Sequence, residues 1–356
     1  MIHVLEVCES YGGGVKKHVD YLDKYLNTSK IQMTFLVSGA RDNADVPDDY
    51  IQYDELSSYR NPLAVIKSVY KILKLVRQNK VDVIHAHSTI AAVLVFFFRL
   101  FFWRKLVLIY TPHAYLSEKK TGRVKSKIVV LIEKMYMSVY DKVINVSYQE
   151  RQHALEHKLT TTRKQIVIRN GIESQSKPVV KRRLEHVVNI ARCDRQKNPF
   201  EFIRIAQRLR NVLDLDFTFV GDGKLLDACR KEVQNLKLTN IKFVGFSHDV
   251  DKWLKMGDVF LSTSLYEGLP FSVIEAEAAG LPVLLTNVVG HQELYRDNGF
   301  LYELGDVDGA ADWIEQMKKH TKRVSYFSRQ SIAIYMERFQ ISKMVEGVEK
   351  IYEEGK

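Results

Sequence analysis

The segment richest in chemical groups reads YEGLPFSVIEAE, from Tyr266 to Glu277. Glu267 precedes a loop shaped by glycine and proline, and Glu275 lies a turn or more inside the helix expected to begin near Phe271. Carboxylates accept hydrogen bonds from vicinal hydroxyl groups, which suits recognition of a sugar or a ribose. The backbone N–H groups of the loop can face an anion or sugar hydroxyls, so the segment predicts a polyol-binding loop.

Two cations, Arg192 and Lys197, lie between a predicted strand, Val187–Ile190, and a predicted helix, Pro199–Leu209. Two cations beside a helix N-terminus suit a diphosphate, because each adds a charge-assisted hydrogen bond. Solvated surface cations are the alternative, but ligands of open parallel sheets lie beyond the carboxyl ends of the strands, which favours binding. Ionised carboxylates are poor partners for phosphate, so these cations together with the two glutamates predict a ligand with diphosphate and polyol parts. A nucleotide sugar has both.

A glycine-rich loop, Ser10–Gly14, follows the first predicted strand, Ile2–Val7. Glycines let the backbone approach a ligand, and a helix N-terminus offers N–H groups to an anion. The loop is not the dinucleotide-binding fingerprint, because the later glycine is missing and Lys16 and Lys17 follow instead. A phosphate site and a simple tight turn both remain open.

No metal site is predicted. His85 and His87 end a strand in the first half, but they would need a third ligand, and no nearby grouping of Cys, His or Glu supplies one. Three D-x-D triplets fit turns or helix starts, where Asp is favoured as a cap; they begin at Asp214, Asp249 and Asp306.

His113 also ends a strand, in the sequence Thr111-Pro112-His113. We expect a hydrogen-bond donor that faces a cleft. A core histidine with satisfied hydrogen bonds is the alternative.

Short β-rich runs alternate with amphipathic helices, a rhythm typical of parallel sheets covered on both faces. The expected strands are Ile2–Val7, Ile31–Val37, Val81–His85, Leu106–Tyr110, Lys142–Val146, Val187–Ile190, Phe217–Val220, Ile241–Val244, Val259–Leu261 and Val283–Leu285. A turn at Asn170-Gly171 and the polar stretch Ser174–Arg183 interrupt the rhythm as a linker would. We therefore expect an α/β protein with two Rossmann-like domains that face each other across a cleft. An amphipathic helix, Ser342–Tyr352, comes last.

The 356 residues suffice for two domains with separate cores. A hydrophobic content of 46% with 27% charged residues excludes a disordered or low-complexity chain. The widely spaced cysteines, Cys8, Cys193 and Cys229, form neither a disulfide framework nor a metal-spaced cluster, which indicates a reducing compartment. No signal peptide is apparent, and cations interrupt the longest apolar stretch, Ala91–Tyr110, so no spanning helix is expected.

The positive charge is one-sided. Residues 1–180 hold 27 Lys and Arg against 17 Asp and Glu, whereas residues 181–356 hold 26 of each. The basic half indicates an anionic partner, with a merely solvated surface as the alternative. No recognised nucleic-acid-binding motif is present, so nucleic acid is not the expected partner. The densest part, Arg99–Lys142, adjoins the aromatic residues Phe96, Phe97, Phe98, Phe101, Phe102 and Trp103.

Over nearly its whole length, the chain resembles glycosyltransferase family 4, the retaining transferases with the GT-B fold, as found in bacterial capsule and exopolysaccharide synthesis. The most specific part of the resemblance is an E-x7-E motif, Glu267 to Glu275. Supporting motifs are Gly12-Gly13-Gly14, Thr111-Pro112-His113, Asn170-Gly171, Arg192 with Lys197, and Val244-Gly245-Phe246. The resemblance implies an acceptor-binding domain at 1–176, a nucleotide-sugar-binding domain at 177–335, and a C-terminal helix at 336–356 that packs back toward the first domain.

The resemblance also implies a role for each matching residue. Arg192 and Lys197 would hold the donor diphosphate, and Glu275 would hold the ribose hydroxyls. The donor sugar would be held by Glu267 and by the backbone of Gly268, Leu269, Pro270, Phe271 and Ser272. The remaining roles are His113 near the reacting sugar, Gly245 and Phe246 along the base, and Gly13 and Gly14 near the diphosphate or the acceptor. The catalytic set would be His113, Arg192, Lys197 and Glu267.

Members of this family retain anomeric configuration without a metal, so no cofactor is expected. The resemblance also favours a UDP-sugar as the donor. The basic first half and its aromatic residues suit an acceptor on an anionic bilayer, although a core position for the aromatics is the alternative. We therefore expect a cytoplasmic protein, peripherally attached to the membrane, that uses a saccharide acceptor on a polyprenyl diphosphate. The alternatives are a non-hydrolysing nucleotide-sugar epimerase and a catalytically silent partner subunit.

Overall fold

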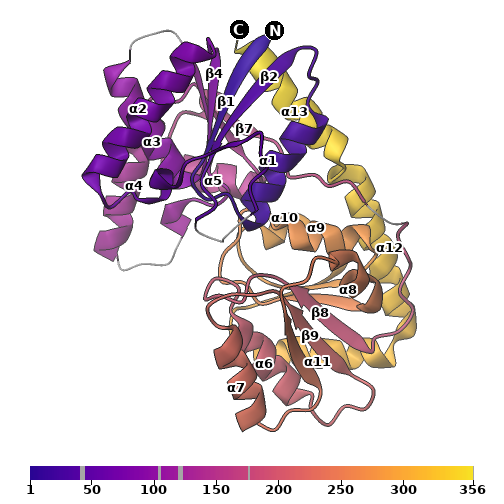
Figure 1. Ribbon diagram of the computed structural model, residues 1–356. Helices are drawn as coiled ribbons and strands as arrows, with labels where there is room; N and C mark the ends of the chain where they lie inside the picture. The colour runs from indigo at the N-terminus through magenta and orange to yellow at the C-terminus, as the bar shows by residue number, and fades with distance from the viewer. Residues whose placement is uncertain (41–44, 103–105, 119–122, 175–176, 356) are drawn as a thin grey trace. The chain divides into compact units, whose positions relative to one another are not determined.

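The computed structural model describes residues 1–40, 45–102, 106–118, 123–174 and 177–355. The chain divides into two compact units (Figure 1). The N-terminal unit comprises Met1–Asn170 and Ile341–Lys356, and the C-terminal unit comprises Gly171–Gln340. The chain thus leaves the N-terminal unit once and returns to it with its last helix, α13 (Ile341–Glu354). Sequence analysis set the boundaries at 176 and 335.

The N-terminal unit contains a seven-stranded parallel sheet in the order β3-β2-β1-β4-β5-β6-β7. Its strands are β1 (Ile2–Cys8), β2 (Ile31–Val37), β3 (Ile51–Gln52), β4 (Val83–His87), β5 (Val107–Thr111), β6 (Lys142–Asn145) and β7 (Gln165–Val167). The strand order reverses between β1 and β4, which makes the carboxyl ends of these two strands the switch point where ligands of such sheets bind. The short edge strands β3 and β7 were not predicted, because two or three residues carry no periodicity.

Helices cover both faces of this sheet. The helices α2 (Pro62–Gln78), α3 (Ser88–Phe101) and α4 (Arg123–Met137) pack on one face and enclose the larger apolar core. The helices α1 (Gly13–Tyr25) and α13 pack on the other face, where Leu22 and Val348 join a second core. The unit also contains α5 (Tyr148–Glu156). Among the described residues, no helix combines the length and apolarity needed to cross a bilayer.

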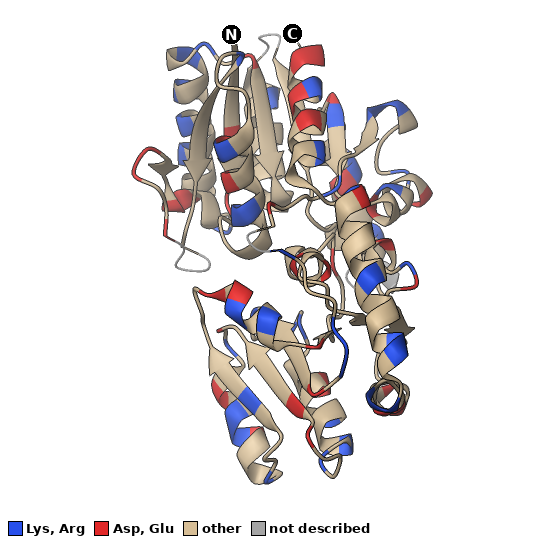
Figure 2. Cartoon of the chain, turned by 90° about the vertical axis from the view of Figure 1, so that its right-hand side faces the viewer, with Lys and Arg blue, Asp and Glu red and all other residues tan. Residues whose placement is uncertain are grey.

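A buried polar chain ties α13 to the sheet. The Tyr352 hydroxyl donates a 2.5 Å hydrogen bond to Glu6 on β1 and lies 2.6 Å from His85 Nδ1 on β4. Nearer solvent, Lys30 pairs with Glu353 at 2.8 Å, and the colours of Figure 2 mark acidic and basic residues along the ribbon of α13. Because all the groups in the buried chain are hydrogen-bonded, the position of α13 is fixed by polar contacts as well as by apolar packing.

The C-terminal unit repeats this architecture with a six-stranded parallel sheet in the order β10-β9-β8-β11-β12-β13. Its strands are β8 (His186–Ile190), β9 (Asp216–Val220), β10 (Ile241–Gly245), β11 (Val259–Ser262), β12 (Val283–Thr286) and β13 (Gly299–Tyr302). Its helices are α6 (Pro199–Arg208), α7 (Leu226–Asn235), α8 (Val250–Met256), α9 (Phe271–Ala278), α10 (His291–Leu294), α11 (Val307–Lys319) and α12 (Thr321–Arg338). The switch point lies between β8 and β11, whose following loops carry Arg192, Lys197 and Glu267.

Candidate functional site

The loops that follow β8 and β11 are joined by backbone and side-chain hydrogen bonds. Leu265 N–H donates to the Gln196 carbonyl at 2.8 Å, and the Thr263 hydroxyl donates to the Lys197 carbonyl at 2.8 Å. Gln196 in turn donates from its side chain to the Tyr266 carbonyl at 3.0 Å. These contacts hold the cation-bearing loop and the E-x7-E segment as one rigid edge of the C-terminal sheet.

Lys197 and Glu267 form a nearly buried ion pair at this edge. Lys197 Nζ lies 2.5 Å from Glu267 Oε1, with the two side chains 14% and 7% exposed. Burial opposes ionisation of Glu267, but Lys197 and His291 outweigh it and lower the pKa of the carboxyl. An ammonium group carries three N–H donors, so the pair leaves donors of Lys197 for a further ligand. Sequence analysis gave the two residues different ligand groups and did not foresee that they contact each other.

Arg192 lies at the same edge and is more exposed than Lys197. Its guanidinium lies 3.4 Å from Asp194 Oδ2, and Asp194 Oδ1 accepts a 3.2 Å hydrogen bond from the Lys197 backbone N–H. Asp194 therefore connects the positions of both cations. We did not single it out from the sequence, although an acidic residue midway between two cations of one loop was a usable signal.

The predicted helix start at Phe271 is confirmed, because α9 spans Phe271–Ala278 with Glu275 inside it and Glu267 before it. Pro270 occupies the N-cap without a side-chain cap. Gly268, Leu269 and Pro270 are buried, whereas Ser272 and Glu275 are half-buried.

The loop at Gly268 packs against a second glycine, Gly290, which has φ +87°. A Cβ atom added at Gly290 would lie 2.4 Å from the Gly268 carbonyl oxygen and 2.9 Å from the Glu267 carbonyl oxygen. Only glycine permits both that backbone conformation and that approach.

Gly245 and Phe246 lie at the end of the edge strand β10, separated from β8 by β9. Gly245 has φ +89°, and Phe246 is 67% exposed, with its ring edge-on to His248 at 4.7 Å. An exposed aromatic ring at a carboxyl edge can stack on a planar ligand group.

In the N-terminal unit, the glycine-rich loop and the histidines lie at the other switch point. Gly13 has φ +52°, and Gly13 and Gly14 are exposed, whereas Gly12 is buried and caps α1 without a side-chain hydrogen bond. The first N–H groups of α1 therefore lie beside the exposed backbone of Gly13 and Gly14. This geometry serves a tight turn and leaves room for an anion.

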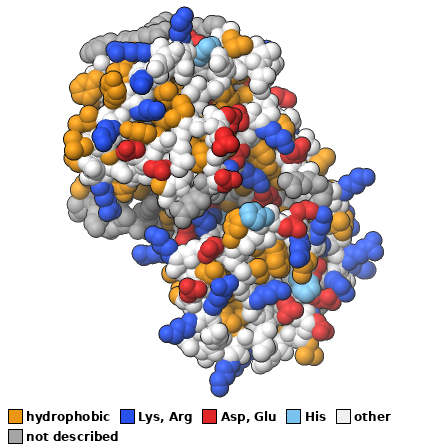
Figure 3. Space-filling model, viewed as in Figure 1, with side chains coloured by type: hydrophobic (Ala, Val, Ile, Leu, Met, Phe, Trp, Pro, Cys, Tyr) orange, Lys and Arg blue, Asp and Glu red, His pale blue; other side chains and the backbone are white. Residues whose placement is uncertain are grey.

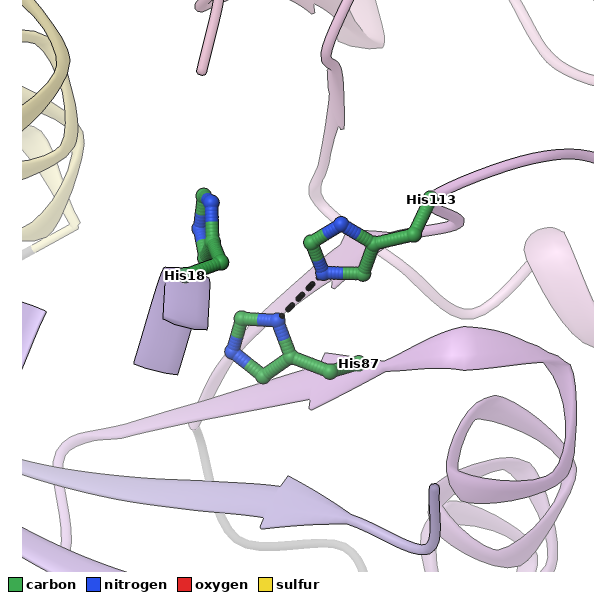
Figure 4. A group of neighbouring side chains, drawn as sticks. All are labelled: His18, His87 and His113. Atoms are coloured by element: carbon green, nitrogen blue, oxygen red, sulfur yellow. Dashed lines mark hydrogen bonds between the residues drawn. The ribbon is translucent and has the colours of Figure 1, made fainter. Parts of the chain in front are cut away.

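Three histidines gather beside this loop, from α1, β4 and the segment after β5 (Figure 4). His113 has φ +58° and is half-buried, and its Nε2 lies 3.0 Å from Nδ1 of His87. His87 Nε2 lies 2.6 Å from a carboxylate oxygen of Glu6. His18 Nδ1 lies 3.0 Å from Asn170 Oδ1.

These contacts determine what His113 can offer. Burial opposes ionisation of Glu6, but His85 and His87 outweigh it and hold the pKa of its carboxyl well below the usual range. An ionised carboxylate only accepts, so His87 donates from Nε2 and accepts at Nδ1 from His113 Nε2–H. The N–H of His113, which was expected to face a cleft, therefore points toward His87. The other ring nitrogen of His113, Nδ1, is an acceptor.

The grouping around His87 was not visible in the sequence, because its members come from separate elements. Glu6, His18 and Asn170 lie far from His87 along the chain. The usable signal was the H-x-H spacing, which puts His85 and His87 on one face of a strand. The D-x-D expectation is confirmed where the structure shows capping, since Asp249 caps α8 and Asp306 caps α11 through their side chains.

Two doubly wound parallel units, each with its chemical groups at the carboxyl edge of a switch point, define the GT-B class of protein. A family model described as "Glycosyl transferases group 1" matches residues 172–333, and one described as "Glycosyltransferase Family 4" matches residues 12–176. The chain belongs to the family 4 glycosyltransferases.

Relatives and solved structures agree with this class. The chain is 25% identical over 308 residues to "UDP-Gal:alpha-D-GlcNAc-diphosphoundecaprenol alpha-1,3-galactosyltransferase" of Escherichia coli, covering 81% of this chain and 79% of that protein. Its fold is similar to that of Anabaena Alr3699/HepE, solved with UDP and glucose, with a TM-score of 0.79, 18% identity, and coverage of 99% and 100%. Sucrose-phosphate synthase of Thermosynechococcus elongatus gives a TM-score of 0.82 at 16% identity, with 99% of each chain covered.

The packing of Gly290 on the Glu267–Gly268 loop can be tested with a matched pair of glycines. Gly305 has φ +86°, but an added Cβ there meets no atom within 4 Å. Gly305→Ala should cost only about 1–2 kcal/mol for the positive φ. Gly290→Ala should cost a further ~1–3 kcal/mol, because the methyl group collides with the loop backbone. Urea unfolding of both variants measures the difference, and equal losses would contradict the contact.

Proposed function

We propose that this protein is a retaining glycosyltransferase that moves a sugar from a UDP-sugar to a hydroxyl group of a saccharide acceptor carried on a polyprenyl diphosphate. The observation that carries the proposal is the Lys197–Glu267 pair with Arg192 beside it, at the switch point of the C-terminal sheet. The E. coli relative is named for a UDP-sugar donor and a diphosphoundecaprenol acceptor, and the Anabaena structure contains UDP and glucose. Relatives named for Vi polysaccharide biosynthesis and O-antigen biosynthesis support a role in a bacterial cell-surface polysaccharide pathway.

The proposed chemistry stabilises a leaving diphosphate. Negative charge grows on the diphosphate as the glycosidic bond breaks, and Arg192 and Lys197 donate charge-assisted hydrogen bonds to it. Glu267 orients Lys197 through their ion pair, so the ammonium donors are positioned before the reaction begins. The diphosphate itself accepts the proton of the acceptor hydroxyl, which then attacks on the face the diphosphate leaves. This route needs neither a protein nucleophile nor a metal ion.

The other residues proposed to bind the sugar donor would act at the carboxyl edge of the same sheet. Half-buried Glu275 would accept hydrogen bonds from the ribose hydroxyls, and exposed Phe246 after Gly245 would lie along the base. The Gly268–Ser272 segment would contact the sugar through its backbone N–H groups. In the N-terminal unit, His113 would contact the reacting sugar as an acceptor at Nδ1, and the Gly13-Gly14 backbone would approach the diphosphate or the acceptor.

Transfer and its stereochemistry can be measured together. We expect the protein to transfer a sugar from an α-linked UDP-sugar to a GlcNAc-diphospholipid, with the α configuration kept in the product. Proton NMR coupling constants of the purified product give the anomeric configuration. A β-linked product would contradict the retaining mechanism, and epimerised donor without any transfer would favour an epimerase.

The two cations can be tested against a neighbour in their own loop. Arg192→Ala and Lys197→Ala should each lower kcat by about 10²–10³-fold, the usual effect of losing one donor to a developing anion. Arg195 is an exposed cation between them, so Arg195→Ala should leave kcat unchanged. Steady-state kinetics with circular dichroism as a folding check make the comparison. Wild-type kcat in both test variants would contradict the assignment.

We further propose that the protein works at the inner, cytoplasmic face of the cell membrane, held there peripherally by its N-terminal unit. That unit carries 29 Lys and Arg against 20 Asp and Glu. Its helices α2 and α4 carry large apolar side chains that are more than 40% exposed: Leu63, Ile66, Tyr70, Ile128, Leu131, Ile132 and Met135. Apolar and basic side chains lie intermixed over these helices (Figure 3). Such a surface suits an anionic bilayer.

The prediction that the aromatic residues from Phe96 to Trp103 face the membrane is wrong for the residues that the structure buries. Phe96 and Phe98 are buried in the core between α3 and its neighbours, because α3 is flanked by α2 and α4. Phe101 is 79% exposed and remains available. Trp103, Arg104 and Lys105 lie outside the described residues, as do Lys119 and Lys120 of the basic segment.

Membrane attachment through α2 and α4 predicts reversible, salt-sensitive binding. The protein should pellet with phosphatidylglycerol vesicles at low salt and much less at high salt, because each surface cation contributes about 1 kcal/mol within a Debye length. Ile66→Gln and Leu131→Gln should weaken pelleting at either salt. Leu213, 82% exposed in the C-terminal unit, supplies the control Leu213→Gln, which should pellet as wild type. A wild-type protein that does not pellet with anionic vesicles at low salt would contradict the proposal.

A further inference from the structure

Three histidine rings of the N-terminal unit converge at its switch point (Figure 4). The ring centroid of His18 lies 5.5 Å from that of His87 and 4.8 Å from that of His113, and the last two lie 5.3 Å apart. One ring nitrogen from each histidine lies within 4.8 Å of the other two. Three nitrogen ligands so close together are the usual protein contribution to a transition-metal site with an open position.

Hydrogen bonds on the far side of two rings orient their lone pairs into the cluster. Glu6 accepts at 2.6 Å from His87 Nε2, which leaves the lone pair of His87 on Nδ1. Asn170 Oδ1 accepts at 3.0 Å from His18 Nδ1, which leaves the lone pair of His18 on Nε2. Metal-binding histidines characteristically donate their other ring N–H to a carboxylate or carbonyl oxygen, and both rings already do so.

The lone pair of His18 is the independent sign of a ligand. His18 is fully buried, and its Nε2 makes no hydrogen bond with any described residue. Buried polar atoms are nearly always hydrogen-bonded, so this nitrogen requires a partner that the chain does not supply. His87 Nδ1 and His113 Nε2 share one proton at 3.0 Å, which a metal ion would replace as the link between them.

All three rings are held in the form that binds metal. Burial lowers the pKa of His18 to about 3 and that of His87 to about 4. Burial and the neighbouring rings hold the pKa of His113 well below its usual value. Each imidazole is therefore neutral near pH 7, as metal coordination requires.

We propose that His18 Nε2, His87 Nδ1 and His113 Nε2 bind one divalent transition-metal ion of the Zn²⁺ class. Binding moves the proton of His113 from Nε2 to Nδ1 of the same ring, so no net proton is lost. Zn–N bonds of about 2.0–2.1 Å require small movements of side chains that lie on three separate elements. The all-nitrogen ligand set favours Zn²⁺, Co²⁺, Ni²⁺ or Cu²⁺ over Mg²⁺, which prefers oxygen ligands.

A neighbouring group, Glu6 with His85 and His87, does not offer the same opportunity. His85 Nδ1 lies 2.6 Å from the Tyr352 hydroxyl, and His85 Nε2 lies 2.8 Å from the Thr111 hydroxyl. The two oxygens of Glu6 are bonded to Tyr352 and His87. Each ligand atom facing that position has a hydrogen-bond partner outside a metal site, whereas the cluster around His18 contains the unpartnered Nε2 of His18.

The metal would act as an inhibitor and not as a cofactor. Coordination at Nε2 of His113 leaves its proton on Nδ1, so Nδ1 no longer accepts a hydrogen bond from the donor sugar. This consequence rests on the proposed function, whereas metal binding itself does not. We therefore expect Zn²⁺ to inhibit transfer and EDTA to reverse the inhibition without lowering the basal rate.

Titration of the full, tag-free chain with Zn²⁺ against a chromophoric chelator tests the site. The wild type should bind one equivalent, and His18→Gln or His113→Gln should weaken binding by more than the roughly 10–100-fold typical of an outer-shell change. His320 is exposed at the end of α11, so His320→Gln should bind as wild type. Co²⁺ should give the visible absorption of a four-coordinate site in the wild type and lose it in the two ligand variants.

The competing location is the pair His153 and His157 on and beside α5, whose ring centroids lie 4.2 Å apart. Binding that disappears in His153→Gln but survives in His18→Gln would overturn the proposal, as would a wild type that binds no Zn²⁺. Thermal unfolding of each variant without metal identifies any that fail to fold. For those, ring-nitrogen chemical shifts of wild-type histidines with and without Zn²⁺ decide the question. Binding at His18 without inhibition would leave the site standing and count against the proposed role of His113.

Discussion

The burial of two ionised carboxylates constrains both halves of this molecule. Glu6 and Glu267 lie at the switch points of their sheets, where water is largely excluded, and a buried charge is costly unless it is paired and hydrogen-bonded. Glu6 draws its donors from β4 and α13, which ties the last helix of the chain to the first strand. Glu267 draws its donor from the loop after β8, which ties the E-x7-E segment to the cation loop. The carboxylates thus decide which elements meet at each switch point.

The same topology gives the two switch points different chemistry. Glu267 is paired with a cation, and Arg192 adds a second one, so that edge presents positive donors to an anion. Glu6 accepts hydrogen bonds from two neutral donors, Tyr352 and His87. His87 in turn accepts a hydrogen bond from His113. That edge presents nitrogen lone pairs, which suit hydroxyl protons or a metal ion. A shared fold therefore does not imply a shared role, and each role depends on the residues placed at the strand ends.

Much of the fold, and the elements that carry the proposed anion site, could be predicted from the sequence, because both depend on local patterns. Strand and helix periodicity defines the two sheets, and the Glu267-to-Glu275 spacing straddles a helix start that the structure confirms. The Lys197–Glu267 contact and the histidine cluster could not be predicted in the same way. Their members lie 70 residues apart in the first case and on three elements in the second, so only the strand order brings them together.

The helix α2 shows that a correctly predicted helix can still expose apolar residues that its pattern would bury. Helical spacing of Leu63, Ile66, Val69, Leu73 and Val76 predicts one buried face. The structure buries Val76, half-buries Val69 and Leu73, and exposes Leu63 and Ile66. A helix apolar on more than its core-facing stripe carries more apolar surface than its own sheet can cover. Exposed Lys67 and Lys74 lie on the same helix, and α4 repeats the combination with Leu131 and Lys127. An anionic bilayer, the partner proposed above for this unit, would cover exposed apolar side chains and pair with the basic groups beside them.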